Sequence, residues 1–336
     1  MQNLQKTWTS DFQSIIDYKP DSHVLALCLH PALDITVYTK NGKQTGRRED
    51  LGGKAVNLAR MLHLLGARVT LVAPNDKHGL TAQLLQGCGY DFELIDTDLC
   101  LRKNVKTIDA CGRIEEHNSC AGTLSPQHYT QLIDRVLHIC RTRQISILAL
   151  CGSFPQGVEK GVYKSLIERA KALNIACVTD ATTDALSLAI QAKPYLIKPN
   201  LQEFCQVFSQ DLSMLKTKEQ VERLIFSSYL ATDVPILCSL DKHGCIYAGR
   251  EGLFDVCGPI VEHVAGFAGA GDTLLASFVY ARMLCNATVE KSLKFACAAA
   301  TAKVRLPANT LPFAQQIFTE WTQIDIRKAE HEIYKK

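Results

Sequence analysis

The segment with the clearest capacity for chemistry is Gly266–Met283, which reads GFAGAGDTLLASFVYARM. A turn of small residues, Gly269, Ala270 and Gly271, runs directly into an apolar helix. Such a start leaves the first amide N–H groups of the helix free to bind an anion, which glycine lets the backbone approach closely. Asp272 follows at once, where its carboxylate can accept a proton from an attacking hydroxyl. An anion cradle beside a base suits phosphoryl transfer to an alcohol, although the same residues would also suit an ordinary capped helix start.

A second glycine segment is Leu51–Arg60, which reads LGGKAVNLAR. Gly52 and Gly53 precede a predicted helix that starts near Lys54. The amide dipoles of such a start can hold a substrate hydroxyl or phosphate. Asn57, one turn further on, can form a hydrogen bond to a sugar. The alternative is a plain loop–helix junction with a solvated lysine. The chain contains neither GxGxxG nor GxxxxGK[ST], which disfavours a dinucleotide-binding or P-loop protein.

A third candidate is the run Lys198-Pro199-Asn200-Leu201-Gln202-Glu203, where a predicted strand ends and a helix begins. Asn200 and Glu203 are three residues apart, so both side chains can face one way on a first helical turn. Two oxygen donors there could orient the water ligands of magnesium beside phosphates. The spacing by itself favours a capping box, in which both side chains bond to the backbone of the helix start.

Composition narrows the class of protein. The 336 residues are 47% hydrophobic and 21% charged, so there is ample apolar material for a core. A net charge of +3 does not favour nucleic acid or an anionic membrane as the partner. No apolar run approaches the ~20 residues that span a bilayer, and the N-terminus lacks the apolar stretch of a secretory signal. The 14 cysteines are scattered without a CxxC pair, which predicts free thiols in a reducing cytoplasm rather than zinc or disulfides.

The elements that must position these motifs alternate along the chain. Short apolar runs predict buried parallel strands, and longer segments of helical period separate them. The predicted strands are Val24–His30, Val69–Ala73, Ile145–Cys151, Ile175–Thr179, Tyr195–Lys198 and Pro235–Ser239, and the predicted helices cover 54–65, 78–87, 126–141, 159–173, 217–230, 270–284, 288–302 and 312–322. This is the pattern of a doubly wound α/β sheet, in which ligands bind outside the carboxyl ends of the strands. Asp34–Lys43 and Asn104–His117 have shorter, more polar alternations that fit either a small accessory sheet or ordinary surface hairpins.

With these segments in place, the chain resembles the phosphofructokinase B family of ribokinase-like sugar kinases, from about Val24 to about Ala302. Six motifs occur in the family's order, and they are HPALD at 30–34, GGKAVNLAR at 52–60, CGSFPQG at 151–157, KPN with Glu203 at 198–203, Ser239-Leu240 with Gly244, and GAGD at 269–272. Their variants are most similar to the branch that acts on phosphorylated ketohexoses, the 1-phosphofructokinase and tagatose-6-phosphate kinase branch. The resemblance implies a mostly parallel doubly wound sheet flanked by helices, with a small and shortened β lid.

The resemblance also implies roles for individual residues in an ATP- and Mg²⁺-dependent kinase. It assigns the catalytic base to Asp272, the anion hole to Gly269, Ala270 and Gly271, and substrate binding to Asp34, Gly52, Gly53, Lys54, Asn57, Arg102 and Ser153. It assigns nucleotide contacts to Lys198, Ser239 and Gly244, and water-mediated magnesium binding to Asn200 and Glu203. Arg102 and Lys54 would neutralise a phosphate already on the sugar, and Arg47 or Arg48 in the lid could add to this.

Several departures from the family pattern leave alternatives open. His30 replaces the usual asparagine, Ala55 replaces a glycine after Lys54, and Asp241 stands where the family has a glycine. A kinase of the same fold for an unphosphorylated sugar or a nucleoside therefore stays an alternative, as does a catalytically weak sugar-phosphate sensor. A dehydrogenase is remote because GxGxxG is missing.

The predicted organisation is one kinase domain over 21–325, with lid segments near 34–50 and 102–118. An N-terminal extension (1–20) would precede it and a C-terminal tail (326–336) would follow. The expected partner is a small-molecule sugar phosphate, with neither nucleic acid nor membrane, in the cytoplasm. The family's lid commonly forms a dimer interface, so a homodimer through the lid is one of the states that the sequence leaves open.

Overall fold

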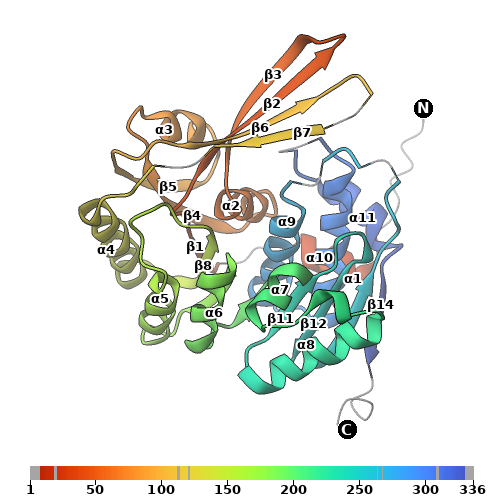
Figure 1. The fold of residues 1–336 in the computed structure, drawn as a ribbon. Coiled ribbons are helices and arrows are strands. Elements are labelled where there is room, and N and C mark those ends of the chain that lie inside the picture. Colours follow the sequence, from red (N-terminus) through yellow and green to blue (C-terminus); the bar gives the residue numbers. More distant parts are fainter. Residues whose placement is uncertain are drawn as a thin grey trace. The chain divides into compact units, whose positions relative to one another are not determined.

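The computed structural model describes residues 8–18, 21–111, 114–119, 122–262, 264–266, 268–307 and 310–329. Contacts divide the chain into two compact units, so the predicted domain at 21–325 contains two contact units. Unit 1 comprises Met1–Ser22, Met61–Arg68 and Leu196–Lys336, and unit 2 comprises His23–Arg60 and Val69–Tyr195. Figure 1 labels the elements of both units along the chain. Among the described residues, no helix combines the length and hydropathy that crossing a membrane requires.

The core of unit 2 is a set of strands in the order β9-β8-β1-β4-β5. Its elements are β1 (His23–Leu27), β4 (Arg68–Asn75), α3 (Leu80–Leu85), β5 (Asp91–Asp96), α4 (Pro126–Thr142), β8 (Ile145–Gly152), α5 (Val162–Lys171), β9 (Ala176–Ala181) and α6 (Thr183–Gln191). Strand β8 pairs in parallel with both β1 and β9, and β4 pairs in parallel with β5. Every residue of β1 is buried, because parallel strands covered by helices must be apolar on both faces. The predicted α/β class with parallel strands is therefore confirmed in this unit.

A second, four-stranded sheet in unit 2 has the order β3-β2-β6-β7. Its strands are β2 (Ala32–Lys40), β3 (Lys43–Gly52), β6 (Arg102–Ile108) and β7 (Ile114–Asn118). The two polar segments thus form the accessory sheet, which was one of the two predicted alternatives. The segment predicted to be short still forms a complete hairpin, with Asn41 and Gly42 in the left-handed region that a tight turn requires. Residues 112 and 113 of the predicted lid lie outside the described residues.

Unit 1 contains the remaining strands in the order β14-β13-β12-β11-β10. Its elements are α1 (Ser10–Ile16), β10 (Leu196–Ile197), α7 (Leu201–Val207), α8 (Lys218–Thr232), β11 (Ile236–Ser239), β12 (Cys245–Gly249), β13 (Gly252–Cys257), α9 (Ala270–Phe278), a π-helix η3 (Val279–Leu284), α10 (Val289–Val304), α11 (Ala314–Trp321) and β14 (Asp325–Ala329), with short 3-10 turns η1 (Leu212–Met214) and η2 (Asp241–His243). Strands β10 and β11 pair in parallel, whereas β11 to β14 pair antiparallel in sequence. The remaining helix, α2 (Lys54–Leu64), begins in unit 2.

The N-terminal segment is part of the core of unit 1. Phe12 of α1 is 0% exposed, and its ring lies 5.0 Å from that of Phe318, 5.6 Å from Trp321 and 5.8 Å from Phe295. The Tyr280 hydroxyl of η3 also donates a hydrogen bond to the Tyr18 carbonyl. The predicted extension (1–20) therefore packs against α10 and α11 wherever it is described, and its residues 1–7, 19 and 20 lie outside the described residues.

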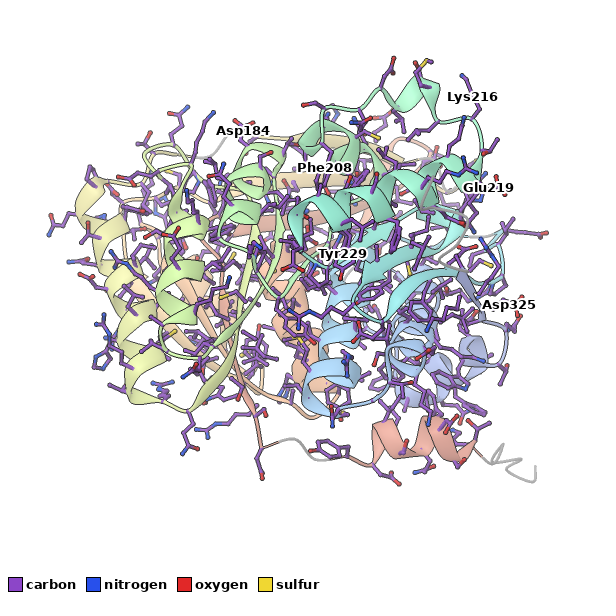
Figure 2. All side chains as sticks on the ribbon, turned by 90° about the horizontal axis from the view of Figure 1, so that it is seen from below. Asp184, Phe208, Lys216, Glu219, Tyr229 and Asp325 are labelled. Atoms are coloured by element: carbon purple, nitrogen blue, oxygen red, sulfur yellow. The ribbon has the colours of Figure 1, made fainter. Side chains whose placement is uncertain are left out.

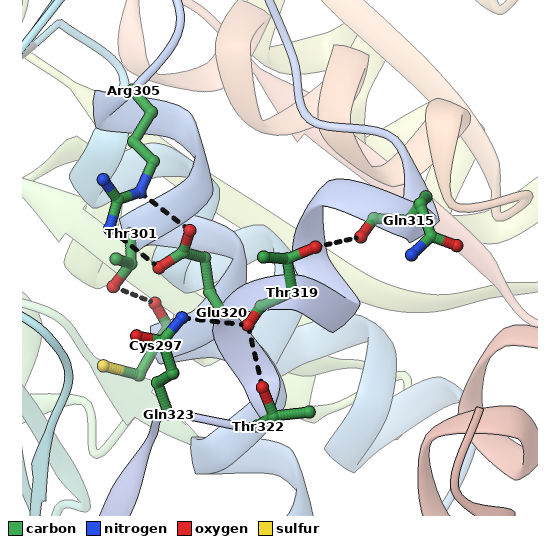
Figure 3. A network of polar contacts seen from close by, with 8 residues as sticks. All are labelled: Cys297, Thr301, Arg305, Gln315, Thr319, Glu320, Thr322 and Gln323. Carbon is green, nitrogen blue, oxygen red and sulfur yellow. Dashed lines mark hydrogen bonds and ion pairs between the residues drawn. The ribbon is translucent and has the colours of Figure 1, made fainter. Parts of the chain in front are cut away.

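The C-terminal boundary also differs from the prediction. Residues 326–329, expected in a tail, belong to β14, which starts at Asp325 (labelled in Figure 2) and pairs with β13. Residues 330–336 of that tail lie outside the described residues. Arg327 of β14 bonds to buried Glu222 of α8, which explains why this polar strand is held. Nearby in sequence, Arg305 and Glu320 join α10 to α11 by two hydrogen bonds (Figure 3).

The aromatic cluster around Phe12 yields a stability prediction. We expect Phe12→Ala to lower the free energy of unfolding by about 3–5 kcal/mol, because it leaves a cavity among three large rings. Phe313→Ala is the matched control, since Phe313 is 65% exposed, and should change stability by less than about 0.5 kcal/mol. Urea unfolding of the full chain measures both values. Equal effects of the two variants would mean that α1 contributes no packing energy.

Candidate active site

The polar residues of unit 2 are organised around the carboxylate of Asp34. Asp34 lies on β2, directly opposite Asn104 of β6 and Asp50 of β3. The Asn104 Nδ2 donates a 2.7 Å hydrogen bond to Asp34 Oδ1. A Cβ atom on Gly52 would lie 2.2 Å from Asp34 Oδ2, so the carboxylate fits only because residue 52 has no side chain. The HPALD motif, which contains Asp34, and the GGKAVNLAR motif, which contains Gly52, therefore lie beside one another.

The surroundings of Asp34 are partly buried and positively charged. Burial raises the pKa of the Asp34 carboxyl above its ordinary value, while the Asn104 hydrogen bond and the charges of Arg102, Lys106 and Arg60 act in the opposite direction. A carboxylate in such a place is an acceptor for hydroxyl donors, since hydrogen bonds from a ligand replace the water that burial removed.

Several polar atoms near this carboxylate have no hydrogen-bond partner among the described residues. Arg102 is the first residue of β6 and pairs with Ala32 of β2, and its Nε is buried without such a partner. The same holds for Asn104 Oδ1. Leaving a buried donor or acceptor unsatisfied costs about 1–3 kcal/mol, so these atoms are suited to a bound polar molecule.

His30 and Ser153 form a pair at the ends of two neighbouring strands. His30 follows β1 and Ser153 follows β8, and these strands are parallel neighbours. His30 Nδ1 and Ser153 Oγ share a 2.8 Å hydrogen bond. Burial, and secondly the charge of Arg102, lower the pKa of His30 to about 4, so the imidazole is neutral at pH 7. Its Nε2 is also buried without a hydrogen-bond partner among the described residues.

Lys54 forms an ion pair within unit 2. Its Nζ lies 2.6 Å from Oδ1 of Asp180, whose side chain is 1% exposed. This pair joins the start of α2 to β9, and the predicted role of Lys54 in binding a substrate phosphate stays a prediction. Beside it, Gly53 has a φ of 126°, which a residue with a side chain rarely adopts, and Asn57 is half-buried on the next turn of α2.

In unit 1, the start of α9 has the geometry of an anion site. Gly269 is the N-cap residue with a φ of 81°, and its carbonyl accepts the first helical hydrogen bond, from Thr273 N. The Nζ of Lys198, a residue 3% exposed, lies 3.3 Å from where a Cβ on Gly271 would be. Asp272 is buried in the first turn. A buried ammonium group thus lies beside a helix N-terminus, and both favour an anion.

The Lys198–Glu203 segment forms the capping box that its spacing favours. Asn200 Oδ1 accepts from Glu203 N at 2.8 Å, and Glu203 Oε2 accepts from Asn200 N at 2.9 Å. Asn200 also forms a β-bridge with Ser239, which brings the fourth and fifth motifs together. Among the described residues, no group of three or more His, Cys, Asp or Glu could hold a metal ion. An amide and a carboxylate that already cap a helix fit a magnesium ion held through water, not one bound directly.

The departures from the family pattern keep the local backbone intact. Ala55 is buried within α2, where alanine suits a helix better than glycine does. Asp241 has a φ of 51°, a left-handed conformation that aspartate tolerates better than most residues. Gly244 has a φ of 87°, and a Cβ there would lie 2.0 Å from the Val256 carbonyl oxygen, so this glycine is needed for packing against β13.

The two lid arginines point to different faces of the accessory sheet. Arg48 lies opposite Thr36 and therefore shares a face with Asp34, whereas Arg47 lies opposite Val37 on the other face. Each is paired with an acidic neighbour, Arg48 with Asp50 and Arg47 with Glu49. Of the two, only Arg48 is on the face that carries Asp34.

The structure therefore brings the predicted residues together within each unit. In unit 2 these are Asp34, Gly52, Arg102 and Ser153, and in unit 1 they are Lys198, Asn200, Ser239 and Gly269–Asp272. Asn104 and Asp180 were not predicted from the sequence, although they contact the predicted residues Asp34 and Lys54. Asn104 is two residues from Arg102 on one strand, and Asp180 directly follows the predicted strand 175–179, so alternation and strand ends were the available signals.

A cluster of polar side chains in unit 2 and, in unit 1, a helix start that favours an anion beside a carboxylate are the kinds of group that phosphoryl transfer to an alcohol uses. The family comparison makes this specific, because the model of the pfkB family carbohydrate kinases matches residues 31–314. The chain belongs to that family and is a carbohydrate kinase.

Curated relatives extend over nearly the whole chain. A 1-phosphofructokinase of Vibrio cholerae serotype O1 is 27% identical over 312 residues, which cover 90% of this chain and 96% of that protein. The ATP-dependent 6-phosphofructokinase isozyme 2 of Escherichia coli K12 is 26% identical over 291 residues, which cover 83% and 91%.

Solved structures confirm the ribokinase-like fold. The tetrameric inhibited form of phosphofructokinase-2 from Escherichia coli has a TM-score of 0.78 at 24% identity, covering 90% of this chain and 98% of that one. Arabidopsis thaliana ribokinase, solved with ribose and ATP, has a TM-score of 0.69 at 16% identity with the same coverage. At these identities the likeness establishes the fold alone.

The contact between Gly52 and Asp34 can be tested directly. We expect Gly52→Ala to lower kcat/KM for phosphoryl transfer by about 10²-fold, because the added methyl group displaces the Asp34 carboxylate. Gly161→Ala is the control, since its φ is −83° and a Cβ there would meet nothing within 4 Å. Unchanged kinetics in Gly52→Ala would show that the carboxylate has no fixed position in the reaction.

Proposed function

We propose that this chain transfers the γ-phosphoryl group of ATP to a hydroxyl of a phosphorylated ketohexose. The candidate acceptors are fructose 1-phosphate, tagatose 6-phosphate and fructose 6-phosphate. The two curated relatives described above are named for phosphofructokinase activities, and the motif variants are most similar to that branch. Family membership supports the reaction class, and the residues of unit 2 support a polyhydroxylated acceptor.

The observation that carries this proposal is that the side chain of Lys198 approaches the first turn of α9. The start of a helix and a nearly buried ammonium group are both positively polarised, and the Lys198 Nζ lies 3.3 Å from where a Cβ on Gly271 would be. Negative charge develops on the transferring phosphoryl group, and preorganised donors in a dry site stabilise such charge most effectively.

The proposed step uses Asp272 as the general base. The acceptor hydroxyl gives its proton to the Asp272 carboxylate while its oxygen forms a bond to the γ-phosphorus. The bond from that phosphorus to the bridging oxygen breaks, which leaves ADP and a sugar bisphosphate. The amides at Gly269–Gly271 hold the transferring group, while Asp34 and Asn57 orient the sugar. Magnesium, held through waters at Asn200 and Glu203, would supply charge neutralisation to the ATP phosphates.

Release of ADP from MgATP, measured against a panel of acceptors, tests this function. The panel contains the three ketohexose phosphates, fructose and ribose. We expect turnover with a phosphorylated ketose, and we expect Asp272→Asn to lower kcat by about 10²–10⁴-fold without loss of folding. Asp184→Asn is the control, because Asp184 also lies in the first turn of a helix but is exposed (Figure 2). Near-normal turnover by Asp272→Asn would refute its role.

Arg102 distinguishes phosphorylated from unphosphorylated acceptors. If the acceptor carries a phosphate, Arg102→Ala should raise its KM by about 10- to 100-fold, which is what a charged hydrogen bond contributes. Arg47→Ala is the control, since Arg47 lies on the opposite face of the same sheet and is exposed. Turnover of ribose or fructose alone, unaffected by Arg102→Ala, would favour the alternative kinase for unphosphorylated acceptors. Sugar-phosphate binding without ADP release would favour the sensor.

We further propose a homodimer and a cytoplasmic location. A homodimer through the four-stranded sheet would use the face opposite Asp34, on which Val37 and Val105 are partly exposed, whereas Leu33 and Ile35 on that face are buried within the chain itself. The tetrameric neighbour described above shows that one protein of this fold assembles. A cytoplasmic location agrees with the absence of disulfides among the described cysteines.

A further inference from the structure

Outside the groups already assigned, the polar residue with the strongest claim to a role is His30. It replaces the asparagine usual in the motif after the first strand. It lies where parallel strands end, two residues before Ala32, which pairs with Arg102. Its ring is fixed on one side by the 2.8 Å hydrogen bond between Nδ1 and Ser153 Oγ.

The other side of the ring lacks a partner among the described residues. Nε2 is buried there without a hydrogen bond, and so are Arg102 Nε and Asn104 Oδ1. Arg102 is near enough for its charge to act on the imidazole, and Asn104 donates to Asp34. Three unsatisfied buried polar atoms, on His30, on the arginine that acts on it and on the asparagine bonded to Asp34, are costly for the chain alone, and a ligand with several hydroxyl groups would satisfy them.

We propose that His30 is a substrate-binding residue that bonds a hydroxyl of the sugar through Nε2, and that Ser153 positions its ring. This inference rests on the proposed function and deepens it. Ser153, which was predicted to bind the substrate, becomes a positioning residue. The assignment gives Arg102 and His30 different functions. Arg102 binds the phosphate through its charge, and His30 recognises the sugar through an uncharged hydrogen bond.

The charge state of His30 agrees with this division. Arg102 is the charged group that acts on the His30 ring, so a protonated ring would repel the arginine that the phosphate needs. Burial and Arg102 keep the pKa of His30 at about 4, so its hydrogen-bonding state is constant from pH 6 to 8. KM for the sugar phosphate should show no step from His30 across that range.

Three variants test the assignment by steady-state kinetics. We expect His30→Ala to raise KM for the preferred sugar phosphate about 10-fold, the value of one hydrogen bond in a dry site, and to leave KM for ATP unchanged. His30→Asn, which keeps a donor and an acceptor, should recover most of the loss. Ser153→Ala should raise KM by a smaller factor, and the double variant should be no worse than His30→Ala, because the two residues act as one.

His128→Ala is the matched control. His128 is also half-buried and also paired with a serine, since its Nδ1 lies 2.9 Å from Ser125 Oγ at the start of α4. It should leave KM for the sugar phosphate unchanged, while thermal unfolding reports any cost in stability for either variant. An equal rise in KM in both variants would show that His30 has only a structural role.

Nitrogen-15 NMR of histidine-labelled protein gives a readout that a structural role would not move. The Nε2 resonance of His30 should shift on addition of fructose 6-phosphate or fructose 1-phosphate and stay in place with inorganic phosphate. A shift with phosphate alone would reassign His30 to the phosphate group. No shift with a sugar phosphate that the wild-type protein binds would overturn the inference and leave the proposed function standing. Absence of all binding by the wild type would overturn both.

Discussion

The constraint on which unit 2 depends is the burial of the Asp34 carboxylate. A partly buried negative charge requires hydrogen bonds and nearby positive charge, and both are present in Asn104, Arg102, Lys106 and Arg60. It also requires space, which explains why residue 52 has no side chain. The pairing of β2 with β3 and β6 follows from the same requirement, because it aligns these partners on one face.

In unit 1, by contrast, positively polarised groups lie together at the start of α9. The first turn of α9 contains Gly271, and the Lys198 ammonium group approaches the place that a Cβ on this glycine would occupy. Asp272 balances part of this charge within the first turn, and a phosphoryl group would balance the rest. Helix α9 continues into the π-helix η3, which Tyr280 joins to the N-terminal segment by a hydrogen bond. Segments that seem peripheral in the sequence therefore support the helix that carries the proposed base.

Most of the fold and half of the site contacts could be predicted from the sequence. Apolar runs predicted the six buried strands because parallel strands are buried on both faces, and a small-residue turn before an apolar helix predicted the anion site. Helix α6 was not predicted although most of its residues are apolar, and β14 was not predicted because it is a polar strand whose Arg327 pairs with Glu222 and Asp255, residues far away in the sequence. The Lys54–Asp180 pair joins residues 126 positions apart, which no local pattern encodes. The contact between Asp34 and Gly52 likewise joins residues on different strands, which no local pattern encodes.

The two substitutions that raised the sensor alternative together with the short lid, Ala55 and Asp241, have backbone conformations that suit the residues present. The case for a weak enzyme assumed that Ala55 and Asp241 distort loops that need glycine. Ala55 instead lies inside a helix, and Asp241 adopts the left-handed conformation that the position demands. His30 introduces no charge, since burial keeps the pKa of its ring well below its usual range. Ala55, Asp241 and His30 are therefore compatible with the local backbone and charge, so these departures from the family pattern give no structural argument against catalysis.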